Sequence, residues 1–181
     1  MVLTRDRDYV LVDLVENRVV RSDELRFGSS PDVRGDFSPD GRTFAFVGSN
    51  WLRMLDVHSG EWLGSPVVAQ RGLAYTATYA PDGSTFATGG ADGSISLWDG
   101  RTGEQRGRFL PGKRNVTTVP MYLPDGHTLQ IASFEGDVFT WDTRPAQWVD
   151  FACRVAGRNF TTEEWRAVFD DRPYRKTCPD N

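Results

Sequence analysis

Residues 38–46 read SPDGRTFAF, and the same kind of segment returns twice further along the chain. Residues 80–88 read APDGSTFAT, 42 positions later, and residues 123–131 read LPDGHTLQI, another 43 positions on. Proline presets φ for a turn, aspartate accepts backbone hydrogen bonds, and glycine tolerates a positive φ. Each copy therefore predicts a tight turn that joins two short strands as a hairpin. The turn residues are Asp40 and Gly41, Asp82 and Gly83, and Asp125 and Gly126.

A second marker, a large apolar residue followed by aspartate, comes 16 or 17 residues after each turn. Its copies are Leu55-Asp56, Trp98-Asp99 and Trp141-Asp142, and counting back another 43 residues gives Val12-Asp13. The residues before each marker alternate, which predicts a strand with one buried face. The inward-facing pairs are Tyr9 and Leu11, Leu52 and Met54, Ile95 and Leu97, and Val138 and Thr140, of which only Thr140 is not apolar.

A period of 40–45 residues with four strands per unit is typical of a β-propeller blade. The segments SPDGRTFAF, ADGSISLWDGRTG and GDVFTWD resemble the WD-repeat family, and the resemblance extends over residues 5–143. Residues 75–107 are close to the consensus of that family. The resemblance implies an all-β fold of four-stranded antiparallel blades.

The chain departs from the family before the first strand of each blade. A full repeat carries a Gly-His pair there, and the histidine joins a buried network with the tryptophan, a serine or threonine and an aspartate. The two histidines of this chain, His58 and His127, lie elsewhere, although Asp92 and Trp98 remain in one blade. We therefore expect an incomplete network and a lower stability.

The repeat divides the chain into a partial blade at 1–32, blades at 33–74 and 75–116, and a last blade at 117–143. The partial blade is predicted to begin at its third strand, around residues 7–13, and the last blade to stop after three strands. A little over three blades are fewer than the four that a closed ring requires. We expect an open arc, either the C-terminal part of a longer propeller or an arc completed by a second copy.

Residues 144–181 leave the repeat and predict a tail of two short helices. Pro145 suits the first turn of one helix and Gly157 suits its C-terminal cap. A capping box and a hydrophobic staple predict the start of the second helix, the box pairing Thr161 with Glu164 and the staple pairing Phe160 with Trp165. Cys153 and Cys178 either bond to each other or remain two reduced thiols.

The tail pattern W…ACRVAGRNFTTEEW…Y…TCP is similar to the C-terminal signature of actinobacterial WD-repeat proteins. In those proteins the propeller often follows a STAND-type signalling NTPase or a DNA-binding domain. The resemblance implies that this chain is the C-terminal part of a bacterial signalling protein.

Charge and hydropathy exclude several classes of function. The net charge of −4 and the pI of about 5.2 argue against a nucleic-acid binder. No apolar run approaches the length of a membrane span, and the start lacks the apolar core of a signal peptide. We expect a cytoplasmic protein, or an extracytoplasmic one if a membrane segment lies upstream.

The sequence predicts no catalytic residue, no cofactor and no metal site. The repeat spreads its aspartates around the ring, so no two of them are expected to share a pocket. Residues 107–114, GRFLPGKR, resemble a phosphate-binding loop, but Arg114 stands where that motif needs serine or threonine. A local basic cluster either meets an acidic partner or a phosphate backbone, or forms a solvated blade edge. It comprises Arg101, Arg106, Arg108, Lys113 and Arg114.

These observations predict a non-catalytic propeller segment that serves as a protein interaction scaffold or sensor. Its partners would be a protein or peptide and the remaining blades. Trp51, Arg53 and Trp62 fall outside the repeat positions and either contact that partner or cover a neighbouring blade. The alternative is a propeller enzyme or ligand sensor with a site in the central channel. The short loops favour the scaffold.

Overall fold

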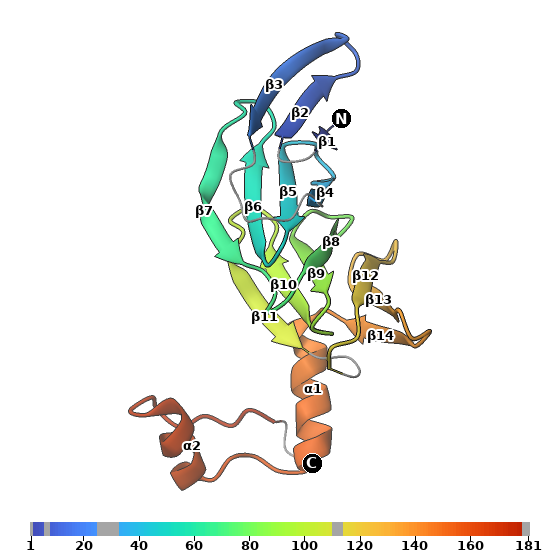
Figure 1. Ribbon diagram of the computed structural model, residues 1–181. Coiled ribbons are helices and arrows are strands. Elements are labelled where there is room, and N and C mark those ends of the chain that lie inside the picture. Colours follow the sequence, from blue (N-terminus) through green and yellow to red (C-terminus); the bar gives the residue numbers. More distant parts are fainter. Residues whose placement is uncertain (1, 6–7, 25–32, 110–113, 179–181) are drawn as a thin grey trace. The chain divides into compact units, whose positions relative to one another are not determined.

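The computed structural model describes residues 2–5, 8–24, 33–109 and 114–178 (Figure 1). Within these residues the chain forms four sheets and two C-terminal helices. The first sheet comprises β1 (Val2–Arg5), β2 (Asp8–Asp13) and β3 (Arg18–Glu24). The second comprises β4 (Val33–Phe37), β5 (Thr43–Gly48), β6 (Trp51–Asp56) and β7 (Trp62–Val68). The third comprises β8 (Ala74–Tyr79), β9 (Thr85–Gly90), β10 (Ile95–Asp99) and β11 (Gln105–Phe109). The fourth comprises β12 (Thr118–Tyr122), β13 (Thr128–Ser133) and β14 (Val138–Asp142).

Each sheet is an antiparallel meander whose strands follow in chain order. The third strands of the two four-stranded sheets, β6 and β10, end at Asp56 and Asp99. The predicted fold class is confirmed: the chain is all-β, with four antiparallel sheets and a short helical tail, consistent with part of a WD-type propeller.

The first sheet has one more strand than the sequence predicted. We expected the partial blade to lack two strands, but β1 pairs with β2 in antiparallel register from Val2↔Leu11 to Arg5↔Asp8. The prediction missed β1 because this strand has only four residues and no Pro-Asp-Gly turn follows it. Among the described residues, the first sheet has no counterpart of β4 and β8, the first strands of the next two sheets.

All three Pro-Asp-Gly segments form the same turn. Gly41, Gly83 and Gly126 have φ values of 70°, 69° and 78°, which an L side chain rarely adopts. In each turn the aspartate Oδ1 accepts the backbone N–H two residues on, at 2.9–3.1 Å. The recurring segment that opens the sequence is therefore a hairpin turn between the first two strands of the last three sheets.

The sheets pack against one another through two apolar clusters. The cluster between the first and second sheets contains Tyr9, Leu11, Val33, Phe44, Phe46, Trp51 and Leu55. The cluster between the second and third sheets contains Ala45, Val47, Leu52, Met54, Ala69, Ala74, Ala77, Tyr79, Phe86 and Trp98. Residues from two sheets meet in each cluster, so neither sheet could bury these side chains alone.

One hydrogen bond between sheets recurs with the repeat. Thr43 Oγ1 lies 3.1 Å from the Tyr79 hydroxyl, and Thr85 Oγ1 lies 2.9 Å from the Tyr122 hydroxyl. Burial raises the pKa of Tyr79 to about 12, so its hydroxyl stays protonated. Each bond joins the second strand of one sheet to the first strand of the next. The pair fixes the register between neighbouring sheets.

The tail, Asp142–Asn181, is a separate compact unit. Helix α1 (Pro145–Ala156) begins at Pro145 and ends at Gly157, whose φ of 67° and N–H bond to the Cys153 carbonyl form the cap. Helix α2 (Thr162–Phe169) begins with the predicted capping box, in which the Thr161 hydroxyl accepts the Glu164 N–H and the Glu164 carboxylate accepts the Thr161 N–H. Both helices are therefore confirmed.

An aromatic cluster and a disulfide hold the tail together. Trp165 is 3% exposed, and it is the one buried side chain among the tail residues that the structure describes. Its ring contacts those of Phe169 and Tyr174, with centroids 4.3 and 5.7 Å away. Cys153 and Cys178 are joined by a disulfide. Because the tail buries so little, this covalent link is its main constraint.

We expect acid to loosen the start of α2. Hydrogen bonds from the Arg158 guanidinium, and then from the Thr161 N–H, hold the pKa of Glu164 at about 2, below its ordinary 4.5. A lowered pKa means that the carboxylate stabilises the folded tail above pH 4.5 and that this contribution is lost as the pH falls from 4.5 toward 2. The NMR signal of the Trp165 indole N–H, which is bonded to the Arg172 carbonyl, reports the change.

Glu164→Gln is the control, because a glutamine side chain does not titrate. The variant should lack the transition in this pH range. If its Trp165 signal follows the wild-type titration, another group is responsible and the prediction is wrong.

Candidate functional site

The carboxylates of the repeat lie in separate turns. A hydrogen bond from Arg106, and then the two backbone N–H groups after β10 that Asp99 Oδ1 accepts, lower the pKa of Asp99. The hydroxyl of Thr128 and two backbone N–H groups lower the pKa of Asp125 to about 2. These groups are ionised acceptors that shape turns, and they are not brought together as an acid–base pair. In the described part of the chain, no three histidine, cysteine or acidic side chains are placed to hold a metal ion.

Trp51 is a buried residue, and of the two roles that the sequence left open, partner contact or cover for a neighbouring blade, its position fits the second. Its side chain is 7% exposed and belongs to the cluster between the first two sheets. The sequence placed it at a loop tip, but the turn before it has only two residues, Ser49 and Asn50, so Trp51 already pairs with Gly48 in the sheet.

Arg53 and Trp62 also take part in packing between strands. The Arg53 guanidinium carbon lies 4.2 Å from the centre of the Trp62 ring, a cation–π contact. Burial lowers the pKa of Arg53 from its ordinary value. The Trp62 ring in turn packs against Tyr9 and Phe46, with centroids 5.6 and 5.5 Å away. Both side chains are only partly buried, and Trp62 packs against the cluster between the first and second sheets.

A buried polar network crosses the third sheet, and it is complete without a histidine. The amide of Gln70 is fully buried, and its Nε2 donates to the carbonyl of Thr88 at 3.0 Å and to its hydroxyl at 3.3 Å. Ser94 Oγ donates to Gln70 Oε1 at 2.6 Å and lies 2.8 Å from Asp92 Oδ1. The indole N–H of Trp98 donates to Thr88 Oγ1 at 2.9 Å.

The expectation of a broken network was therefore wrong. Gln70 stands before β8, where the family carries histidine, and its amide offers a donor and an acceptor at one end of the side chain, as an imidazole does. Sequence reasoning missed Gln70 because it looked for the histidine alone. The available signal was the polar residue Gln70 in the segment AQRG (residues 69–72), which directly precedes the first strand of the near-consensus repeat.

We expect Gln70→Leu to lower the free energy of unfolding by about 1–3 kcal/mol, because Thr88 and Ser94 would lose partners in a dry site. Gln70→His is the matched control, since an imidazole restores one donor and one acceptor, and it should cost less. Chemical denaturation followed by tryptophan fluorescence measures both. Equal losses for leucine and histidine would show that the side chain matters only for its volume.

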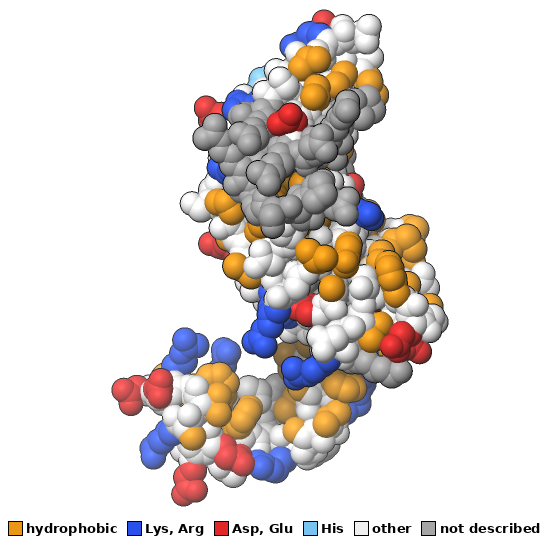
Figure 2. Space-filling view, in the orientation of Figure 1, with side chains coloured by type: hydrophobic (Ala, Val, Ile, Leu, Met, Phe, Trp, Pro, Cys, Tyr) orange, Lys and Arg blue, Asp and Glu red, His pale blue; other side chains and the backbone are white. Residues whose placement is uncertain are grey.

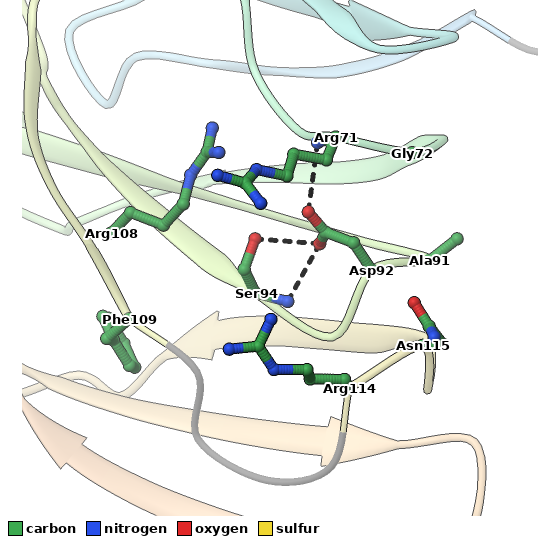
Figure 3. Close-up of a pocket in the computed structure, with 9 residues that line it drawn as sticks. All are labelled: Arg71, Gly72, Ala91, Asp92, Ser94, Arg108, Phe109, Arg114 and Asn115. Atoms are coloured by element: carbon green, nitrogen blue, oxygen red, sulfur yellow. Dashed lines mark hydrogen bonds between the residues drawn. The ribbon is translucent and has the colours of Figure 1, made fainter.

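Beside this network lies a hollow of about 550 Å³, which we call the arginine hollow (Figure 3). Its lining is Arg71, Gly72, Ala91, Asp92, Ser94, Arg108, Phe109, Arg114 and Asn115. Figure 3 shows the side chains of Arg71 and Arg108 on one side of Asp92 and Ser94, and the guanidinium of Arg114 on the other. The hollow collects positive charge from residues that are up to 43 positions apart in sequence.

The predicted basic cluster is divided in the structure. Arg106 forms an ion pair with Asp99 at 2.6 Å, and Arg101 is exposed but does not line the hollow. Arg108 and Arg114 line it together with Arg71, which the sequence did not associate with them. Lys113 lies outside the described residues, as do the other residues from 110 to 112 of the loop that resembles a phosphate-binding motif.

The Asp92 carboxylate is held by the protein itself. Its Oδ2 accepts the Arg71 N–H at 3.0 Å, its Oδ1 accepts the Ser94 N–H at 2.9 Å, and the Ser94 hydroxyl lies 2.8 Å from Oδ1. Burial raises the pKa of Asp92, but these hydrogen bonds and the charge of Arg108 outweigh burial and leave the pKa below its ordinary value. Asp92 is therefore ionised at neutral pH and positions the loops around the hollow.

No helix among the described residues is long and apolar enough to cross a membrane.

Comparison with known proteins agrees with this geometry. A family model described as "WD domain, G-beta repeat" matches residues 68–99, which span the network from Gln70 to Trp98. The chain is also similar to the intraflagellar transport protein 122 homolog of Mus musculus, with 37% identity over 62 residues. That alignment covers 34% of this chain and 5% of the mouse protein, so the chain spans a small part of its relative. Residues 68–99 are thus a WD repeat, and these matches support placing the chain in a WD-repeat family.

Proposed function

We propose that this chain is a non-catalytic scaffold or sensor segment of a larger bacterial signalling protein, in which a STAND-type NTPase precedes the propeller. WD repeats point to protein interaction in general. The C-terminal pattern from Trp148 to Cys178 supports the link to actinobacterial signalling proteins.

The exposed fraction at one repeat position supports the proposal that a further blade or a partner covers the fourth sheet. The same inward position recurs every 43 residues, and its occupants Tyr9, Leu52 and Ile95 are 0%, 1% and 0% exposed. Val138, the fourth member, is 61% exposed. The side chain is as apolar as its counterparts, so what differs is the absence of a neighbouring sheet among the described residues.

The fourth sheet presents other apolar side chains as well. Met121 is 52% exposed and Phe134 is 76% exposed. Figure 2 shows hydrophobic side chains gathered where β12–β14 lie in Figure 1. A contiguous apolar surface of this kind is typical of an interaction site. A further propeller sheet, supplied by the longer protein or by a second copy, would best cover these apolar side chains.

We expect the isolated chain to self-associate for this reason. Light scattering after gel filtration should give a mass above the 20.3 kDa of one chain. Val138→Glu should reduce the association, because a charge cannot be buried cheaply between sheets. Val155→Glu, at an exposed position of α1, is the control for a surface valine replaced by a charge. A 20.3 kDa species with cooperative unfolding in the wild type would contradict the proposal.

The signalling part of the proposal has its own test. The coding sequence upstream of Met1 should encode a nucleotide-binding domain with a phosphate-binding loop before a helix. If the upstream sequence encodes further WD repeats but no such domain, the scaffold function would still stand and the link to an NTPase would be wrong.

The disulfide also bears on location. Cys153 and Cys178 are bonded in the structure, and disulfides persist mainly in oxidising compartments. We therefore propose the extracytoplasmic alternative for this segment, which requires a membrane segment upstream. Maleimide labelling of the native protein under denaturing, non-reducing conditions should find no free thiol. Two labelled thiols per chain would favour the cytoplasm.

A further inference from the structure

The arginine hollow carries a local charge opposite to that of the whole chain. Three arginines and one aspartate line it, so its net charge is +3 − 1 = +2, whereas the chain carries −4. The three arginines come from different places: Arg71 precedes β8, Arg108 is on β11 and Arg114 follows β11. The fold therefore brings together a positive charge that no single stretch of sequence holds.

Two of these arginines make no ion pair with any acidic residue that the structure describes. The guanidinium groups of Arg71 and Arg114 have no side-chain hydrogen bond to the described residues, and the Asp92 carboxylate beside them already accepts the backbone N–H groups of Arg71 and Ser94. Elsewhere in the chain exposed arginines do pair, as Arg106 does with Asp99 and Arg158 with Glu164. The hollow thus keeps donors that a ligand can use.

The third arginine is fixed in place. Arg108 Nε donates to Ser96 Oγ at 3.0 Å, and its Nη2 donates to the carbonyl of Ala69 at 2.7 Å. A guanidinium held in this way loses little freedom when it binds an anion. One anchored and two movable guanidinium groups suit a planar carboxylate or a phosphate, both of which arginine binds with paired hydrogen bonds.

The size and remaining lining of the hollow indicate what carries the anion. A volume of about 550 Å³ fits one or two side chains. Phe109, Gly72 and Ala91 supply apolar wall against which the carbon stem of a side chain can pack. Nucleic acid would instead need a row of basic side chains on the protein that follows its phosphate backbone. The net negative charge of this chain also repels nucleic acid.

We propose that the arginine hollow binds an anionic side chain of a partner peptide, either a glutamate or aspartate carboxylate or a phosphorylated residue. The proposal rests on the function proposed above, since it names the chemistry of the partner that a scaffold would hold. Arg71 and Arg114 close on the anion from the two sides of Asp92, and Arg108 supplies the fixed charge.

Fluorescence anisotropy with the full chain at low salt tests the proposal. The probes are three labelled peptides that differ at one central pair of residues: glutamate, phosphoserine or glutamine. We expect the glutamate or the phosphoserine peptide to bind and the glutamine peptide to bind at least about tenfold more weakly, because charged hydrogen bonds are lost. Whichever anionic peptide binds more tightly identifies the source of the anion.

Variants locate the site. Arg71→Ala and Arg114→Ala should each weaken the anionic peptide by about tenfold or more. Arg101→Ala removes the same charge from an exposed residue outside the hollow, and it should change affinity by less than about twofold. Thermal unfolding of each variant shows whether its sheets are intact.

The results distinguish a failure of this proposal about the arginine hollow from a failure of the proposed scaffold function. If no anionic peptide binds, or if Arg101→Ala weakens binding as much as Arg71→Ala does, the assignment of the hollow is overturned, while self-association through Val138 still tests the scaffold. If a single-stranded oligonucleotide binds with the same dependence on Arg71 and Arg114 and the peptides do not, the hollow is a nucleic-acid contact and the proposal is wrong.

Discussion

Replacing Trp98 with alanine is expected to lower the free energy of unfolding of the stacked sheets by about 3–5 kcal/mol. Trp98 is 1% exposed and lies in the cluster between the second and third sheets, with its ring stacked on Phe86 at a centroid distance of 6.1 Å. The substitution leaves a cavity between two sheets and also removes the donor that Thr88 Oγ1 accepts. Urea denaturation followed by circular dichroism gives the change.

Two variants make this result specific. Trp98→Phe keeps most of the apolar volume and loses the N–H, so it should cost clearly less than alanine. Trp51→Ala should cost nearly as much as Trp98→Ala, because Trp51 is also buried, at 7% exposed. If Trp98→Ala costs less than about 1 kcal/mol, as a surface substitution does, the packing between these sheets is not what stabilises the chain.

Removal of the disulfide should destabilise the tail unit by about 2–4 kcal/mol, which is enough to unfold it. The bond closes a loop between residues separated by 25 positions, and the described tail has one buried side chain, Trp165, to support it. Units of this size rarely fold on a core alone. We expect Cys153→Ser with Cys178→Ser to abolish protection of the α2 amides from hydrogen exchange.

The sheets serve as the internal control in that experiment. Amides of β9 and β10 belong to the other compact unit and should keep their protection in the double variant. Treatment of the wild type with a reducing agent should reproduce the effect. A tail that stays protected without the bond would mean that the contacts of Trp165 and the hydrogen bonds of Asn159 to Thr177 and Cys178 suffice.

Most of the fold could be predicted from the sequence because the repeat depends on residues that act locally. A Pro-Asp-Gly turn depends on φ preferences and on short-range hydrogen bonds, so Gly41, Gly83 and Gly126 could be read directly. The capping box at Thr161 is local in the same way. Strand β1 was missed because its four residues carry no such local signal.

Side chains that act over long distances in the sequence were harder to predict. Gln70 completes a network with Ser94, 24 positions away, and Arg71 shares a hollow with Arg114, 43 positions away. The pairing of Gln70 with Ser94 does not follow from the repeat, and although Arg71 and Arg114 are one 43-residue period apart, that spacing does not predict a shared hollow. The role of Trp51 stayed open for a related reason: whether an aromatic residue next to a turn faces solvent or core depends on where the turn ends, and in the structure Trp51 already pairs with Gly48.

The threonine–tyrosine bond between sheets gives this architecture a simple route to change its length. The repeat at 75–116 carries both partners of this bond, because Tyr79 pairs with Thr43 of the preceding sheet and Thr85 pairs with Tyr122 of the next. The repeat at 33–74 has Phe37 at the tyrosine position and so supplies only the threonine. A gene duplication of the unit at 75–116 would therefore supply both partners of this bond at each new boundary between sheets. Proteins built in this way can evolve by adding or deleting whole units while the joints between them stay unchanged.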